Sequence, residues 1–329
     1  MHISFARPIR ITRLASSALK AKHFALLIAC LGLLPLRGGL AVSAAAQSAE
    51  RLWKLDVPSQ AVEVRHADGH VSSGEFLSEI VLLPDGTANG GWSLFEAGTQ
   101  PTITLFRIFE GRVATDERIG PLFTFRAQKL TAPVGESITI TLQPAPANNG
   151  TSKGQWKLTV QDAASQNTVA HELLSFVAEA SVRNCRNCID ADVTFGHISA
   201  PAQTVVVQTL RGSYTANFEN VALVFPGGRA SGLLVLSRPD GALLTFQVVA
   251  GLMQVRDDTA IVSVLVARGI PRAGSAAGDE ITIILHPSTD HHQEDLIYDI
   301  LGTQVGPAHF KATGVQNLYA PDLPSRKNH

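Results

Sequence analysis

The sequence predicts an all-β protein with two tandem antiparallel β domains after a cleaved signal peptide. Apolar and polar residues alternate in short runs bounded by turn residues, and sustained helical periodicity is scarce. The pattern also occurs twice, about 142 residues apart, so that Ile138-Thr139-Ile140-Thr141-Leu142 returns as Ile281-Thr282-Ile283-Ile284-Leu285. Because a repeat of this length can bury a core of its own, we expect two domains rather than solenoid units.

Residues 1–46 are predicted to be the signal peptide. Six basic residues and no acidic one occur there, and the apolar run 24–36 is shorter than the ~20 residues of a spanning helix. Ala44-Ala45-Ala46 suits signal peptidase, which places the mature chain outside the cell or in the periplasm. Leu27-Ile28-Ala29-Cys30 resembles a lipoprotein signal, so lipidation at Cys30 stays open.

The charge of the mature chain argues against nucleic acid as a partner. Removal of the six basic residues from the 27 in the chain leaves 21 against 28 acidic ones, a net charge of −7. Binding to nucleic acid or anionic lipid requires clustered Lys and Arg. No second apolar segment reaches spanning length, so no integral membrane segment is expected in the mature chain.

Domain one is placed at 47–184 and domain two at 201–319, with a linker at 185–200 and a tail at 320–329. Both domains open on Pro-x-Gln followed by alternating valines, at Pro58 and at Pro201. The next strands, 77–83 and 219–225, each end at a Pro-x-Gly turn, because Pro fixes φ and Gly supplies a positive φ.

The middle strands follow in the same order in both copies. Strands 91–96 and 102–109 in domain one match 232–237 and 243–249 in domain two, and Gly111 and Gly251 are expected to end the second of each pair. Three further matched pairs are expected, at 122–128 with 260–267, at 138–142 with 281–285, and at 156–160 with 296–301.

The last strand of each copy carries conflicting local signals. Residues 169–182 contain helix-forming residues, but Gly306 and Pro307 in the second copy would break a helix interior. We therefore expect a strand from Phe176 to Asn184 and from Phe310 to Asn317, with a short helix at 171–176 left open. About eight strands per copy, without a long crossover, fit either an up-and-down barrel or a sandwich, and we favour the barrel.

A resemblance supports export and β architecture. Asp258-Thr259-Ala260 before an alternating strand, and Ala277-Gly278-Asp279-Glu280 after it, resemble secreted bacterial β modules that follow choice-of-anchor regions. The resemblance covers about 100 residues of copy two and is weaker in copy one. It implies no activity, since that family has none assigned.

Cys185 and Cys188 form the sharpest local motif. A C-x-x-C pair can be a redox couple, half of a zinc site or a small structural disulfide. A thioredoxin-like couple needs a βαβ setting and zinc needs two more ligands, and neither surrounds this pair. We expect a structural disulfide.

The densest polar cluster is a candidate metal site, made of Asp290, His291, His292 and Asp295. The alternative is a solvated loop between two strands, because copy one has no ligands at the equivalent loop. His66 and His70 flank Asp68-Gly69 and are expected at a turn.

Trp92 and Trp156 lie on predicted strands, where they are either core anchors or platforms on which a ligand stacks. The H-E-x-x-H signature of zinc hydrolases and the P-loop of nucleotide-binding enzymes are absent from the sequence.

The sequence therefore favours a non-catalytic protein of structural or surface interaction, with no cofactor expected. An unknown protein is the expected partner. The first alternative is a carrier that holds a small apolar ligand inside a barrel. The second is a hydrolase, which would have to gather groups such as His286, His291 and Asp295.

Overall fold

The structure is a computed structural model. It describes residues 52–98, 100–131, 134–145, 153–162, 171–185, 194–237, 241, 243–256, 260–270, 279–288, 294–302 and 306–320. Within these ranges every regular element is a strand except one 3-10 turn, Pro226–Gly228, and no helix is long and apolar enough to cross a membrane.

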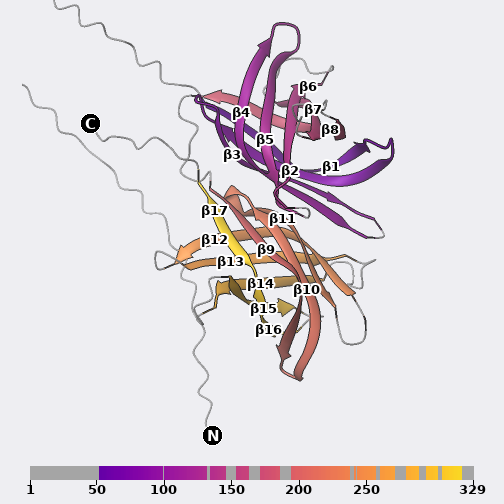
Figure 1. The fold of residues 1–329 in the computed structure, drawn as a ribbon, viewed down its shortest axis with the longest axis vertical. Coiled ribbons are helices and arrows are strands. Elements are labelled where there is room, and N and C mark those ends of the chain that lie inside the picture. Colours follow the sequence, from indigo (N-terminus) through magenta and orange to yellow (C-terminus); the bar gives the residue numbers. More distant parts are fainter. Residues whose placement is uncertain are drawn as a thin grey trace, which may run out of the picture. The chain divides into compact units, whose positions relative to one another are not determined.

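The first domain is a closed antiparallel barrel of eight strands (Figure 1). Each strand pairs with the next, and β8 returns to pair with β1. The strands are β1 Leu52–His66, β2 Val71–Leu82, β3 Thr87–Glu96, β4 Thr102–Asp116, β5 Gly120–Lys129, β6 Ser137–Pro144, β7 Lys153–Asp162 and β8 Glu172–Cys185.

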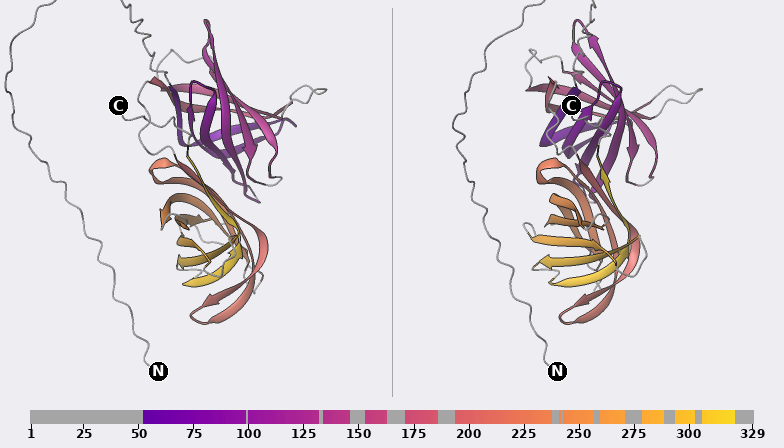
Figure 2. Two further views of the ribbon diagram at one scale, coloured as in Figure 1. Left: turned by 60° about the vertical axis from the view of Figure 1, so that its left-hand side comes forward. Right: turned by 90° about the vertical axis from the view of Figure 1, so that its left-hand side faces the viewer.

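The second domain repeats the barrel (Figure 2). Its strands are β9 Phe195–Thr209, β10 Gly212–Val224, β11 Arg229–Ser237, β12 Leu243–Arg256, β13 Ala260–Gly269, β14 Glu280–Pro287, β15 Asp295–Gly302, β16 Ala308–Thr313 and β17 Val315–Tyr319. Strands β16 and β17 both pair with β9 and together take the place of β8. They are separated by Gly314, where an added Cβ would lie 2.7 Å from the Ser199 carbonyl oxygen.

The period-2 pattern fills the two barrel interiors. In the first barrel Trp92 packs against Phe76 and Phe106, with ring centroids 5.2 and 4.9 Å away. In the second, Phe218 packs against Tyr298 and Phe310, with both centroid distances 4.7 Å. Ile140 and Ile283, predicted to be equivalent, are 1% and 0% exposed in their respective cores. The predicted duplication of the sheet-forming unit is confirmed.

The structure corrects three details of the sequence reading. Strand β9 begins at Phe195, inside the predicted linker, and residues 172–176 belong to strand β8, so the helix left open there is wrong. Gly111 and Gly251 lie inside β4 and β12 rather than at their ends. A Cβ on Gly111 would come within 2.6 Å of the Phe125 ring, so this glycine permits close packing instead of a turn.

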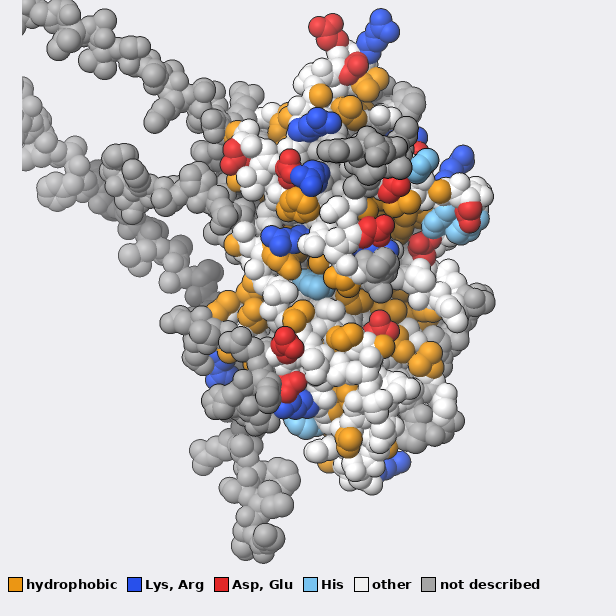
Figure 3. All heavy atoms as spheres, in the orientation of Figure 1, with side chains coloured by type: hydrophobic (Ala, Val, Ile, Leu, Met, Phe, Trp, Pro, Cys, Tyr) orange, Lys and Arg blue, Asp and Glu red, His pale blue; other side chains and the backbone are white. Residues whose placement is uncertain are grey.

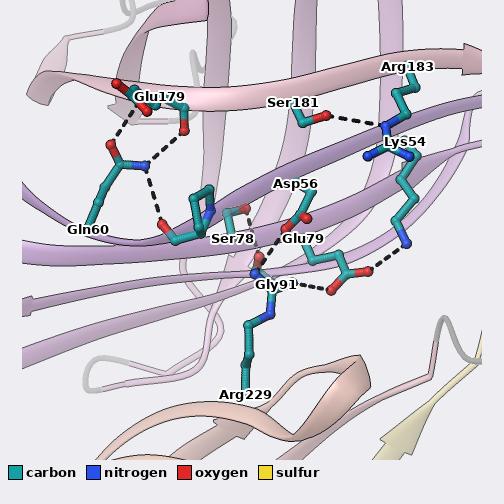
Figure 4. Close-up of polar contacts among 11 residues, drawn as sticks. Lys54, Asp56, Gln60, Ser78, Glu79, Gly91, Glu179, Ser181, Arg183 and Arg229 are labelled. Atoms are coloured by element: carbon teal, nitrogen blue, oxygen red, sulfur yellow. Dashed lines mark hydrogen bonds and ion pairs between the residues drawn. The ribbon is translucent and has the colours of Figure 1, made fainter. Parts of the chain in front are cut away.

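A glutamine side chain bridges the seam of each barrel. Between Asp56 and Arg65 strand β1 has more residues than β8 has opposite it, so the ladder is interrupted. Gln60 spans this gap: its Nε2 donates to the Glu179 carbonyl at 2.8 Å, and its Oε1 accepts from the Glu179 N–H at 2.8 Å (Figure 4). Gln203 makes the same two bonds with Thr313, at 2.7 and 2.8 Å. The repeated Pro-x-Gln is therefore a barrel clasp, in which a side-chain amide replaces a peptide group.

Candidate interaction surface

The predicted metal cluster is only partly within the described residues. Asp290, His291 and His292 lie outside them. Asp295 opens β15, where its Oδ2 lies 2.7 Å from the Lys311 Nζ. Across the described part of the chain, no group of three or more His, Cys, Asp or Glu side chains could hold a metal ion.

The other predicted site residues belong to the scaffold. Cys185 is the last residue of β8, and Cys188 lies outside the described residues, so the disulfide stays a prediction. Trp92 and Trp156 are 0% and 5% exposed and pack in the core of the first barrel. Their position agrees with core anchors, and burial leaves neither ring open for a ligand to stack from solvent.

A polar cluster closes one end of the first barrel. His66 Nε2 lies 3.0 Å from the Ser72 Oγ and 2.9 Å from the Glu96 Oε1, and Ser72 also donates a hydrogen bond to Glu96. In a catalytic triad the acid holds the imidazole Nδ1 while Nε2 takes the proton of the serine. Here Ser72 and Glu96 meet the same nitrogen, so the cluster is a polar cap over the core and lacks the triad relay. His70 and Asp68 form the predicted turn beside it.

Outward-facing apolar residues join the two barrels, which belong to one compact unit, Ser48–His329. Leu77, Phe95 and Leu105 of the first barrel form a buried cluster with Leu223 and Phe225 of the second. A Cβ on Gly91 would lie 3.0 Å from the Phe225 ring, a tight contact that the glycine avoids.

A charged group borders the apolar join. Arg229 Nη2 donates to the Glu79 Oε2 at 2.5 Å, and Lys54 Nζ lies 3.1 Å from the Glu79 Oε1 (Figure 4). The Glu79 side chain is only 8% exposed, and the two cations pair with its carboxylate in place of water. Arg229 Nη1 also lies 2.9 Å from the Asp56 Oδ1, but this atom has no hydrogen-bond partner, so the contact is an ion pair without hydrogen-bond geometry.

We expect Arg229→Ala to destabilise the protein by about 2 kcal/mol, because it leaves the buried Glu79 carboxylate with one cation. Unfolding of the two barrels can be followed separately. All three tryptophans lie in the first barrel, so tryptophan emission follows its unfolding. All three tyrosines lie in the second, so tyrosine near-ultraviolet absorption follows that barrel. The control is Arg268→Ala, which removes an exposed 3.9 Å pair with Glu280 and should cost under about 0.5 kcal/mol. Equal stability of the two variants would contradict the assignment.

His197 is a buried imidazole in the second barrel. It is 6% exposed on β9, and neither ring nitrogen has a hydrogen-bond partner among the described residues. Its cross-strand neighbours, Leu223 on β10 and Asn317 on β17, carry no charge. Lys54 occupies the position equivalent to His197 in the first barrel, where it pairs with Glu79. The residue equivalent to Glu79 in the second barrel is Val221, which carries no charge. Burial lowers the pKa of His197 from 6.5 to about 4.

This shift predicts acid sensitivity. As the pH falls below about 6.5 the unfolded chain binds a proton at His197 before the folded chain does, so stability is full at neutral pH and declines toward pH 4. The loss at pH 5 should be about 2 kcal/mol. Denaturant unfolding at neutral and mildly acidic pH measures it, and His197→Leu should remove this part of the pH dependence. An unchanged slope in the variant would assign the effect to other groups.

The outer walls of the two barrels differ at equivalent positions. In the first barrel Arg112 on β4 pairs with Thr124 on β5, and Thr124 with Thr141 on β6. Arg112 and Thr124 also line a shallow depression of about 290 Å³, together with Glu110, Gly111, Arg126 and Thr139. The second barrel has apolar residues in the corresponding register, where Leu252 pairs with Val264 and Val264 with Ile284.

The apolar wall extends over β12 to β15. We call it the β12–β15 wall and define it by Leu252, Val262, Val264, Val266, Ile284 and Leu301. Leu252 and Leu301 are 52% and 49% exposed, and the other four are partly exposed. In the space-filling view, charged side chains are more frequent on the first barrel than on the second (Figure 3). Leu252, Val264 and Ile284 adjoin one another, whereas Thr282 separates Val266 from Leu301. Adjoining exposed apolar residues often mark surfaces that bind other molecules.

Sequence reasoning missed the glutamine clasp, Arg229 and the β12–β15 wall. The signal for the wall was present in the aligned copies, as a change from Thr124 and Thr141 to Val264 and Ile284. Comparison of the chain with protein families, with characterised proteins and with solved structures finds no match.

Proposed function

We propose that the protein is an exported, non-catalytic β-repeat protein that binds a partner on the β12–β15 wall. The contrast between the copies carries this proposal. Both barrels need an apolar interior in order to fold. At three matched outward positions, however, the first barrel has Arg112, Thr124 and Thr141 where the second has Leu252, Val264 and Ile284. Folding requires apolar residues inside each barrel but not on its outer face. We therefore attribute the difference in polarity between the two outer faces to function.

Export is supported by the basic, apolar and small-residue segments of residues 1–46 and by the resemblance of copy two to secreted β modules. The charge of the mature chain, −7, speaks for a protein partner over nucleic acid.

The packing of the first barrel speaks against the carrier and the hydrolase. A carrier needs space inside the barrel, yet Phe76, Trp92, Phe106 and Phe176 occupy the interior, as expected for an eight-stranded barrel filled by side chains. A serine hydrolase needs an acid on one imidazole nitrogen and the serine on the other, whereas His66 contacts both Ser72 and Glu96 through Nε2.

Site-specific photo-crosslinking tests the proposal. A photoreactive residue in place of Leu252 should give an adduct of discrete mass in cells that export the protein. The matched control replaces Arg112, which occupies the equivalent outward position of the first barrel. Equal labelling at both positions, or none at Leu252, would contradict the proposal, and a stoichiometric small molecule retained in native mass spectrometry would support the carrier instead.

A further inference from the structure

We infer that the first barrel has a binding site of its own at the open seam between β1 and β8, and that this site takes a side-chain carboxamide from an extended peptide segment of a partner. The site is separate from the β12–β15 wall and goes beyond the proposed function.

The seam leaves part of β8 without a partner in the ladder. Strand β8 pairs with β1 up to Ser175 and again from Ser181, and residues 176–180 between them have no cross-strand neighbour in β1. Within this gap the main-chain N–H and C=O of Glu179 are both bonded by the side chain of Gln60 (Figure 4).

Val177 lies in the same gap, and among the described residues no side chain bonds its main chain. The main-chain groups of every second residue in a strand point to the same edge. Since those of Glu179 point toward β1, the N–H and C=O of Val177, two residues earlier, point there too. The gap therefore presents one donor and one acceptor at Val177, in the arrangement that Gln60 fills at Glu179.

A cavity of about 640 Å³ opens on this gap. Its lining includes Val177, which is 45% exposed, and Phe176, which is 4% exposed and belongs to the core of the barrel. Neighbouring residues of a strand point to opposite faces, so a cavity on the outer surface reaches Phe176 because the seam is open. Its volume lies within the range of ligand sites, about 300–1,000 Å³.

Charged residues of both signs surround the cavity, namely Glu63, Arg65, Lys157 and Glu172. Glu63 and Arg65 form an exposed pair at 3.8 Å, whereas the side chains of Lys157 and Glu172 have no ion pair or hydrogen bond in the part of the chain that the structure describes. Two charges of each sign disfavour a polyanion or a polycation. They suit a peptide, whose main chain is neutral and whose side chains can match charges of either sign.

The second barrel differs at the equivalent positions. Three residues after the clasp glutamine the first barrel has Glu63 and the second has Val206. One residue after the strand position that faces the proline of β6 or β14, the first barrel has Lys157 and the second has Ile297. Closure of a barrel of this kind therefore does not require the charges of the first seam.

The clasp indicates the chemistry of the ligand. A primary amide carries an acceptor and a donor in one plane, and Gln60 uses both on Glu179, at 2.8 Å each. A glutamine or asparagine side chain of a partner would make the same two bonds with Val177, with its stem against the Phe176 ring. Two hydrogen bonds and a small apolar contact predict a reversible complex with a Kd of about 0.1–1 mM.

Amide hydrogen exchange of the mature protein tests whether the gap is open. We expect the Glu179 N–H, which Gln60 holds, to exchange at least about tenfold more slowly than the Val177 N–H. Equal protection of the two amides would show that Val177 already has a partner, and the inference would fail.

Binding is measured by nuclear magnetic resonance titration of the ¹⁵N-labelled mature protein with acetyl-Val-Gln-Val-methylamide. The control peptide has leucine in place of glutamine. We expect saturable shifts of the amide signals of residues that line the cavity, and at least about fivefold weaker binding of the leucine peptide. Absence of saturable binding, or equal affinity for the two peptides, would overturn the inference.

Val177→Pro removes the N–H donor without breaking a ladder hydrogen bond, so it should reduce the affinity for the glutamine peptide to that for the leucine peptide. If this variant does not fold, Val177→Trp should block the cavity with an outward ring and have the same effect. The control is Val206→Trp, which alters a residue that is 58% exposed in the seam of the second barrel and should leave binding unchanged. Folded Val177 variants that bind like the wild type would place the peptide elsewhere and contradict the assignment.

Discussion

The substitution Ile283→Asp should unfold the second barrel, at a cost above about 4 kcal/mol. Ile283 is 0% exposed in the core, flanked by Leu265 on β13 and Ile300 on β15. A carboxylate at this position has neither water nor a cation, so folding must either bury an unpaired charge or protonate the group. The free-energy cost of either is large compared with the total stability of a domain.

The two barrels can be followed separately in this experiment. All three tryptophans, Trp53, Trp92 and Trp156, belong to strands of the first barrel. Circular dichroism should therefore lose strand signal while tryptophan emission stays close to native. Thr282→Asp is the matched control, because Thr282 faces outward on the same strand between Val266 and Leu301. If Ile283→Asp folded as well as Thr282→Asp, the assignment of the inward face of β14 would be wrong.

Removal of a glutamine clasp should give the second largest effect. Gln60→Ala deletes both hydrogen bonds to Glu179 and a third, from Nε2 to the Pro58 carbonyl. We expect a loss of about 2–3 kcal/mol and faster hydrogen exchange along the β1–β8 seam. Gln203→Ala should act alike in the second barrel, since Gln203 bonds Thr313 and Pro201 in the same way.

Two variants isolate the geometry of the clasp. Gln60→Glu keeps an acceptor for the Glu179 N–H but cannot donate to the two carbonyls, so it should be about as unstable as Gln60→Ala. Gln128→Ala removes an exposed glutamine of β5 and should leave stability unchanged to within about 0.5 kcal/mol. A clasp variant as stable as Gln128→Ala would show that the ladder alone closes the barrel.

Features that depend on residues close together in the sequence could be predicted, and features that depend on long-range strand pairing could not. Alternation along Ile138-Thr139-Ile140 and Ile281-Thr282-Ile283 placed the core residues, because a strand repeats every two residues whatever it packs against. The Pro-x-Gly turns that end at Gly86 and Gly228 were equally local, and both glycines have positive φ. The helix left open at 171–176 was an error of local propensity, overridden by the pairing of β8 with β7.

Barrel closure was beyond the sequence, because it depends on a pairing between the first and last strands of each copy. The clasp belongs to that pairing, since Gln60 and Glu179 are 119 residues apart. The same is true of the contact between Arg229 and Glu79, which joins two barrels. No local pattern identifies such partners, because their proximity exists only after the sheet has closed.

By itself, the sequence determined the all-β class, the duplication and the inward face of each strand, since these follow from backbone periodicity and from burial of apolar side chains. Tertiary structure alone decided closure into barrels, the burial of His197 without a partner, and the alignment of Leu252, Val264 and Ile284 into one wall. Each of these depends on which strands lie side by side, and long-range hydrogen bonding sets that order.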